Sequence, residues 1–151
     1  MKTQMDLNMN LTEYFTLKEM VQSATAVKYG IENLPTEADV ERLRALCTMV
    51  LEPLRRKFGV IRITSGYRSL ALNKAVKGVK DSQHTKGEAA DIHCSSVEQA
   101  LKMAYYVRDR LTFDQLLIER VMLNGCCWIH VSYVVETPER KNRKMLRFVT
   151  I

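Results

Sequence analysis

The longest amphipathic segment of this 151-residue chain begins at Thr36 and constrains the fold more than any other feature. Thr36 followed by Asp39 is typical of a helix N-terminus, because the Thr hydroxyl can accept a hydrogen bond from the Asp39 amide. Apolar side chains then recur at helical spacing: Val40, Leu43, Leu46, Cys47, Val50, Leu51 and Leu54. This stripe must be buried, so the chain has to fold around a core. Pro53 predicts a kink or an early end of the helix.

Three shorter helices are predicted around this segment. One covers 16–27 with Thr16 as its N-cap, a second covers 69–76, and a third begins at Ser96 and ends near Arg110. They supply the other elements that can pack on a sheet.

Strand patterns occupy most of the second half of the chain. The stretches 60–64 and 89–93 alternate or are rich in apolar residues, and 113–133 divides into two strands around Asn124 and Gly125. The last stretch, 146–151, is a further candidate strand. Together the elements predict an α+β fold, in which a small antiparallel sheet packs against helices from the N-terminal half.

Length and composition fit a single soluble domain over residues 1–151. The apolar fraction of 46% and the charged fraction of 26% are close to the globular average, which argues against disordered, collagen-like and membrane classes. No apolar run approaches the ~20 residues that cross a bilayer. Residues 1–10 lack the apolar segment of a secretory signal, so we expect synthesis in the cytoplasm without membrane insertion.

The net charge of +6 would attract anionic polymers, including nucleic acid and bacterial cell wall. The one basic cluster is interpreted as a solvated tail and comprises Lys141, Arg143, Lys144 and Arg147. No stripe of aromatic and basic residues and no nucleic-acid motif accompanies it. Nucleic-acid binding would therefore rest on charge alone, and no specific nucleic-acid partner is expected.

Four cysteines are present without a C-x-x-C spacing: Cys47, Cys94, Cys126 and Cys127. A domain of this length does not need disulfides, so we interpret them as reduced, buried thiols. A zinc role for the adjacent pair is the less favoured alternative.

His84 and Asp91 are candidate metal ligands, because zinc in hydrolases takes three ligands from His, Asp or Glu and keeps one position open. They lie seven residues apart, at the end of a loop and on the strand that follows it. This spacing alone is weak, since a single His is usually a surface or core residue and a single Asp usually a helix cap.

The predicted hairpin brings a carboxylate to a third histidine. A two-residue turn at Asn124 and Gly125 would place Glu119 directly opposite His130 on the neighbouring strand. Opposed residues share a face, so Glu119 would stand where the general base of a zinc hydrolase is needed. Leu117, Val121, Trp128 and Ser132 would share that face. A register change of one residue would turn Glu119 away and leave it a solvated carboxylate.

Arg68 follows a predicted strand and a Ser-Gly-Tyr turn. A guanidinium in this position is suited to bidentate capture of a carboxylate, either a substrate terminus or an acidic side chain. The alternative is an ordinary surface ion pair.

Three motifs in the same order resemble a known family: SGYRSLALNKAVKGVKDSQHTKGEAADIH, FDQLLIE and WIHVSY. They are similar to VanY-like zinc D-Ala-D-Ala carboxypeptidases and to the L-alanyl-D-glutamate endopeptidases of bacteriophage lysins. The resemblance covers most of the chain, and the upstream segment YFTLKEMVQSATAVKYGIENLP is similar to the helical start of a subgroup from bacteria and their phages. It implies a zinc peptidase that acts on the stem peptide of peptidoglycan.

The resemblance also implies roles for individual residues. His84, Asp91 and His130 match the ligands of one zinc ion per chain, and Arg68 matches the arginine that binds substrate and stabilises the transition state. Two further positions match contacts around the site, Ser82 and Gln83, and Trp128 is a candidate substrate contact on the face of Glu119.

One position departs from the resemblance. Several relatives carry the general base in an E-x-x-H pattern before the last ligand, but this chain has Cys127 there. Glu119 is the preferred base, and Glu88 is the fallback, although Glu88 and Asp91 would point to opposite faces of a strand.

Several possibilities stay open. The activity could be trimming of a terminal D-Ala or a cut within the stem, as in a phage lysin that reaches the wall after release or export. The missing E-x-x-H base favours the alternative of an inactive zinc-binding interaction module of the same fold, as in hedgehog-type domains. We expect a monomer.

Overall fold

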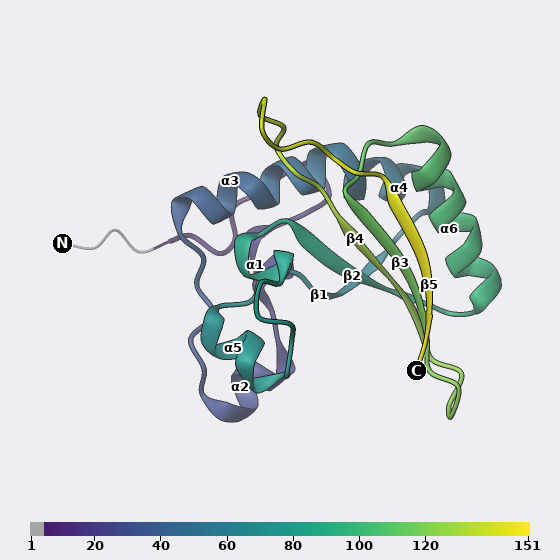
Figure 1. The fold of residues 1–151 in the computed structure, drawn as a ribbon. Coiled ribbons are helices and arrows are strands. Elements are labelled where there is room, and N and C mark those ends of the chain that lie inside the picture. Colours follow the sequence, from purple (N-terminus) through teal and green to yellow (C-terminus); the bar gives the residue numbers. More distant parts are fainter. Residues whose placement is uncertain (1–4) are drawn as a thin grey trace.

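Five strands form one sheet in the computed structural model, which describes residues 5–151 (Figure 1). The strands lie in the order β1-β2-β4-β3-β5. Their bounds are β1 Arg62–Ser65, β2 Ala89–Cys94, β3 Gln115–Arg120, β4 Cys127–Ser132 and β5 Met145–Thr150. Six α-helices accompany the sheet in the described part of the chain, five of them before β2, and the predicted α+β class is confirmed.

The sheet is mixed rather than purely antiparallel. β1, β2, β4 and β3 pair antiparallel, as predicted, but β5 runs parallel to β3. β4 ends at the edge of the sheet where β3 starts, and the connection over 133–144 stays at this edge and passes β3, so that Met145 lies opposite Gln115. The Met145 amide donates to the Asp114 carbonyl at 2.9 Å and fixes this start. Because β4 runs antiparallel to β3, a chain that leaves β4 and re-enters the sheet at the same end on the other side of β3 runs parallel to β3.

Apolar and polar side chains alternate along β2, β3 and β4, so the sheet has one apolar and one polar face. The apolar side chains are at most 3% exposed: Ala90, Ile92, Leu116, Ile118, Ile129 and Val131. Helix α6 (Val97–Arg110) packs on this face, and its N-cap Ser96 accepts from the Gln99 amide as predicted. Burial of each Leu or Ile side chain contributes about 1.5–3 kcal/mol to the free energy of folding. The opposite face is left for polar side chains.

The helix predicted from Thr36 forms as one continuous helical segment, in which a π-helical turn joins two α-helices. The capping box of Thr36 and Asp39 opens α3 (Glu37–Leu46), as predicted. A π-helical turn, η1 (Cys47–Leu51), then leads into α4 (Glu52–Phe58). Pro53 therefore does not end the helix. Because a proline lacks an N–H and crowds the carbonyl four residues earlier, the wide turn in front of it accommodates the ring.

The single helix predicted over 16–27 is wrong. Thr16 caps α1 (Leu17–Val21), and a second helix, α2 (Ala24–Tyr29), follows after a break. Gln22 has an extended backbone there, and the Ser23 hydroxyl accepts from the Ala26 amide. A serine that caps a new helix competes with continuation of the old one.

The turn of the β3–β4 hairpin differs from the prediction. Glu119 lies opposite Trp128, and His130 lies opposite Leu117. The loop between the paired residues Arg120 and Cys127 has three residues before Asn124 and one after Gly125, and of its residues only Gly125 has a positive φ, of 72°. A type I′ turn needs positive φ at both central residues, so the predicted turn does not form. The register is displaced by two residues, which leaves Glu119 and His130 on the same face.

The remaining short elements lie near the polar face. The helix predicted over 69–76 is α5 (Leu70–Ala75), capped by Ser69, and a 3-10 helix, η2 (Gln83–Lys86), precedes β2. The four cysteines are all free thiols, as predicted, but Cys126 is exposed at the hairpin loop rather than buried.

Across residues 5–151, none of the helices combines the length and the apolar character that crossing a membrane requires. The prediction that residues 1–10 contain no secretory signal falls partly outside the described residues.

Candidate metal centre and active site

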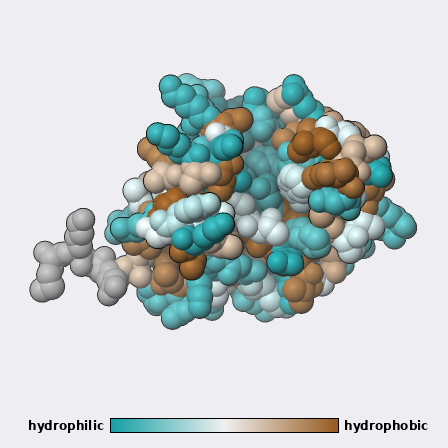
Figure 2. All heavy atoms as spheres, turned by 90° about the horizontal axis from the view of Figure 1, so that it is seen from below, coloured by the Kyte–Doolittle hydropathy of each residue, from teal (hydrophilic) through white to brown (hydrophobic). Residues whose placement is uncertain are grey.

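A pocket of about 640 Å³ opens on the polar face of β2, β3 and β4. Seen from below, the molecule shows a hollow with hydrophilic side chains at its base (Figure 2). The pocket lining includes every candidate site residue of the sequence analysis: Arg68, Ser82, Gln83, His84, Asp91, Glu119, Trp128 and His130.

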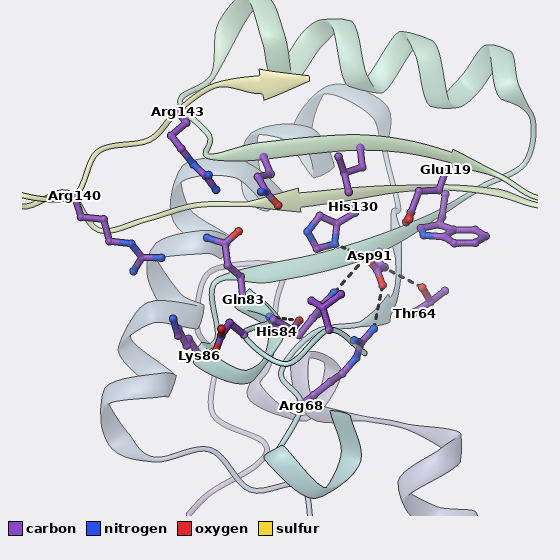
Figure 3. Close-up of a pocket in the computed structure, with 16 residues that line it drawn as sticks. Thr64, Arg68, Gln83, His84, Lys86, Asp91, Glu119, His130, Arg140 and Arg143 are labelled. Atoms are coloured by element: carbon purple, nitrogen blue, oxygen red, sulfur yellow. Dashed lines mark hydrogen bonds and ion pairs between the residues drawn. The ribbon is translucent and has the colours of Figure 1, made fainter. Parts of the chain in front are cut away.

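His84, Asp91 and His130 meet at the floor of this pocket (Figure 3). Their ligand atoms all lie within 4.8 Å of one another, and this is the one group of three or more such side chains found among the described residues. His84 comes from η2, Asp91 from β2 and His130 from the directly opposed position of β4. Residues far apart in the chain thus converge because β2 and β4 pair in this register.

The hydrogen bonds of the two imidazoles decide which atoms face the centre. The Nδ1 atom of His84 lies 2.7 Å from the Gly66 carbonyl oxygen, which can only accept, so Nδ1 carries the proton. Nε2 of His84 and Nδ1 of His130 then face the same Asp91 oxygen, at 3.4 and 2.9 Å. Each of these contacts is satisfied either by a proton on the nitrogen or by a cation between the nitrogen and the carboxylate. The three groups therefore fit a metal cation held by two nitrogens and one oxygen, with the carbonyl of Gly66 orienting the first ligand.

The electrostatics of Asp91 agree with this geometry. Burial opposes ionisation, but hydrogen bonds from His130 and His84 and their positive charge hold the pKa of the carboxyl well below its usual range. Asp91 is therefore an anion at neutral pH, as a metal ligand must be.

Glu119 lines the same pocket from β3. It lies opposite Trp128 rather than opposite His130, the partner that was predicted. It is a diagonal neighbour of His130, at roughly 7 Å between Cβ atoms. Burial and then the charge of Asp91 raise the pKa of the Glu119 carboxyl, against opposing effects of Trp128 and the two histidines. A carboxylate with raised proton affinity beside the candidate metal ligands has the properties of a general base.

Cys127 and Glu88 do not offer this function. Cys127 lies three residues before His130 on a strand, so its side chain points to the apolar face, where it is 2% exposed. Glu88 is 1% exposed, and both of its carboxylate oxygens accept from Arg140, at 2.7 and 2.9 Å. The fallback base is therefore already paired with an arginine.

Arg68 is held at the edge of the metal group. A bulge in β1 between Ile63 and Ser65 turns the chain toward the pocket. The Arg68 guanidinium donates to the Ser65 hydroxyl at 3.0 Å and to the Asn73 side-chain oxygen at 3.2 Å, and it lies 3.5 Å from Asp91. It is thus a fixed cation beside the candidate metal, rather than a surface ion pair.

The other predicted contacts have different surroundings. The Ser82 hydroxyl accepts from the His84 amide at 3.2 Å, so this buried serine also orders the turn that carries the first ligand. The Gln83 amide nitrogen donates to Asp114 at 3.1 Å. Trp128 lies opposite Glu119 and lines the pocket.

The sequence analysis did not assign several other residues of the pocket lining to the site. Lys86, Gln115, Arg140 and Arg143 line the pocket, and Arg143 pairs with the buried Asp114. The interpretation of the basic cluster as a solvated tail is therefore wrong for Arg143. The available signal was Asp114, an acid that directly precedes β3 and follows the apolar Phe113.

Residues 13–132 match the family model described as Peptidase M15. The matched range contains all three candidate metal ligands, Arg68 and Glu119, and it ends before Arg140 and Arg143. No curated protein matches the chain.

Proposed function

The chain belongs to the peptidase M15 family, which implies a metallopeptidase, and we propose that it is a zinc-dependent peptidase that cleaves the stem peptide of peptidoglycan. The resemblance to VanY-like carboxypeptidases and to lysin endopeptidases suggests a bond next to a D-amino acid. We further propose that the protein acts as a monomer with one zinc ion, and that it reaches the wall after release or export.

One observation carries this proposal. Ligand atoms of His84, Asp91 and His130 lie within 4.8 Å of one another in a pocket that also contains Glu119 and Arg68. Two imidazoles and one carboxylate are a ligand set that suits zinc and leaves a position open. When bound, zinc would polarise the scissile carbonyl and make a nearby water more acidic.

The residues of the chain supply the other parts of the reaction. Glu119 would accept the proton of the attacking water and return it to the leaving amine, so that the proton balance closes within one turnover. Arg68 would donate to the developing oxyanion or to a substrate carboxylate, and its bonds to Ser65 and Asn73 keep it in place before substrate arrives.

The test is mass spectrometry of purified stem peptides after incubation with the protein, with and without a zinc chelator. Loss of one D-Ala that the chelator prevents would assign a carboxypeptidase, and an internal cut that the chelator prevents would assign an endopeptidase. Cleavage that persists after all metal has been removed would contradict a metallopeptidase.

A second candidate function is a zinc-binding interaction module without activity. The absence of a glutamate at the position of Cys127 favours it. Full zinc occupancy without cleavage of any stem peptide would support the module and contradict the enzyme.

A further inference from the structure

One end of the pocket is basic. Lys86, Arg140 and Arg143 line it, and they lie on the opposite side of His84 and His130 from Arg68 and Glu119 (Figure 3). We call these three side chains the basic end. Lys86 is the last residue of η2, whereas the two arginines come from the connection 133–144, outside the range that matches the family model.

Two buried acids hold the arginines of the basic end in place. Glu88 accepts from Nη1 and Nη2 of Arg140, and Asp114 accepts from Nε and Nη2 of Arg143 at 3.0 and 2.9 Å. Asp114 accepts in addition from the Arg143 backbone amide at 3.0 Å. The acid side chains are 1% and 3% exposed, whereas the arginine side chains are 46% and 54% exposed. The carboxylates are therefore inside, and the guanidinium edges face the pocket.

Each arginine keeps unused donors after these bonds. A guanidinium has five N–H groups, of which the buried acid takes two in each case. The Nε of Arg140 and the Nη1 of Arg143 have no hydrogen bond to another described residue. Donors that are fixed before a ligand arrives lose little conformational entropy when they bind it.

Lys86 adds a positive charge that is not part of an ion pair in the described part of the chain. Its ammonium group forms no ion pair among residues 5–151, although its side chain lines the pocket. The surface that a ligand meets at the basic end is thus cationic, despite the two buried ion pairs.

We propose that the basic end is a subsite for a carboxylate of the substrate, located across the scissile bond from the part that contacts Arg68. The substrate class is an acidic peptide that extends to both sides of the metal group. This inference rests on the proposed peptidase function and deepens it, because it assigns specificity to a segment outside the family match.

The test uses two synthetic stem peptides that differ only in one group, a free carboxylate or the matching carboxamide, on the side of the scissile bond away from Arg68. The rate constant kcat/KM is measured for both by mass spectrometry. Binding is measured separately through the fluorescence of Trp128, which is the only tryptophan and lines the pocket. The protein is the full chain loaded with zinc.

The wild type is expected to prefer the carboxylate about tenfold, the size of one charge-assisted hydrogen bond. Lys86→Gln should reduce the preference about threefold, and Lys86→Glu should abolish it. Lys86 is the residue of choice because its ammonium group has no buried partner that the change would leave unpaired. The matched control is Lys57→Gln, an exposed lysine of α4 outside the pocket, which should keep the wild-type preference.

The outcomes separate the two proposals. Turnover of both peptides without a preference, or a preference that Lys86→Glu leaves unchanged, would overturn the carboxylate subsite and leave the peptidase standing. Binding that prefers the carboxylate without turnover would uphold the subsite and contradict the peptidase. Absence of binding to both peptides would overturn the subsite.

Discussion

The two ends of the pocket are built by different means. At the metal end, Asp91 and His130 lie on paired central strands, so the backbone ladder sets their separation. At the basic end, Arg140 and Arg143 lie on a connection between strands, and side-chain ion pairs set their positions. Groups that must hold a metal within tenths of an ångström belong on rigid strands, whereas groups that select a substrate can lie on connections that vary. Substitutions at the first end should change chemistry, and those at the second should change stability and selectivity.

The largest expected effect comes from removing a ligand at the metal end. His130→Ala should abolish zinc binding and turnover, because two ligands remain where zinc in hydrolases has three. Metal content per chain, measured by mass spectrometry of the dialysed protein, checks this. His93→Ala is the matched control, since His93 is an exposed histidine of β2 that does not line the pocket. Equal loss of zinc in both variants would contradict the assignment.

The next largest effect separates the two candidate bases. Glu119→Gln should lower kcat by about 10²–10⁴-fold with zinc retained, which is the usual contribution of a general base. Glu88→Gln should lower kcat less than tenfold and should instead lower the melting temperature, because Glu88 is a buried partner of Arg140. Steady-state kinetics and thermal unfolding of the two variants measure the contrast. The reverse pattern would make Glu88 the base.

A smaller effect concerns stability at the basic end. Asp114→Asn should reduce the free energy of unfolding by roughly 2 kcal/mol, because a buried carboxylate loses charge-assisted bonds to a half-exposed arginine. Urea denaturation measures the change. The variant Arg108→Gln, which alters the exposed ion pair with Asp109, is the control and should leave the midpoint of urea denaturation at the wild-type value.

The same acid gives the stability of the protein a dependence on pH. Burial tends to raise the pKa of Asp114, but hydrogen bonds from Arg143 outweigh it and hold the pKa below the ordinary value of 3.8. A carboxyl with a lowered folded-state pKa stabilises the fold above its unfolded pKa, and this stability is lost as the pH falls through the folded-state value. Below about pH 4 the wild type should therefore lose stability more steeply than Asp114→Asn. Parallel pH profiles of the two proteins would contradict the pairing.

The smallest effect is expected at the hairpin loop, which belongs to neither end. Gly125 has φ +72°, and a Cβ added there would meet no other atom within 4 Å. Gly125→Ala should therefore lower the free energy of unfolding only by the strain of an alanine in the left-handed conformation, about 1–2 kcal/mol. Turnover should stay at the wild-type level. A loss of activity without loss of stability would show that the loop contacts the substrate.

Local signals predicted most of the helices. Thr36 and Ser96 cap helices as expected, because a cap depends only on residues a few positions away. The convergence of His84, Asp91 and His130 came from the resemblance rather than from spacing, since the pairing of β2 with β4 is not encoded in any local pattern.

Features that depend on loop geometry or on distant partners could not be predicted. The hairpin register was displaced by two residues because Asn124 and Gly125 form a longer loop than their types favour. Glu119 kept its face only because the displacement was even. Arg143 was interpreted as solvated because its partner Asp114 lies 29 residues earlier and becomes a neighbour only through the parallel β3–β5 pair.

The most direct test of the metal centre is a zinc-edge anomalous difference map from crystals of the purified protein. We expect one peak at about 2.0–2.2 Å from Nε2 of His84, an Asp91 carboxylate oxygen and Nδ1 of His130. A fully zinc-loaded protein whose peak lies elsewhere, for example at Cys126 and Cys127, would contradict the account.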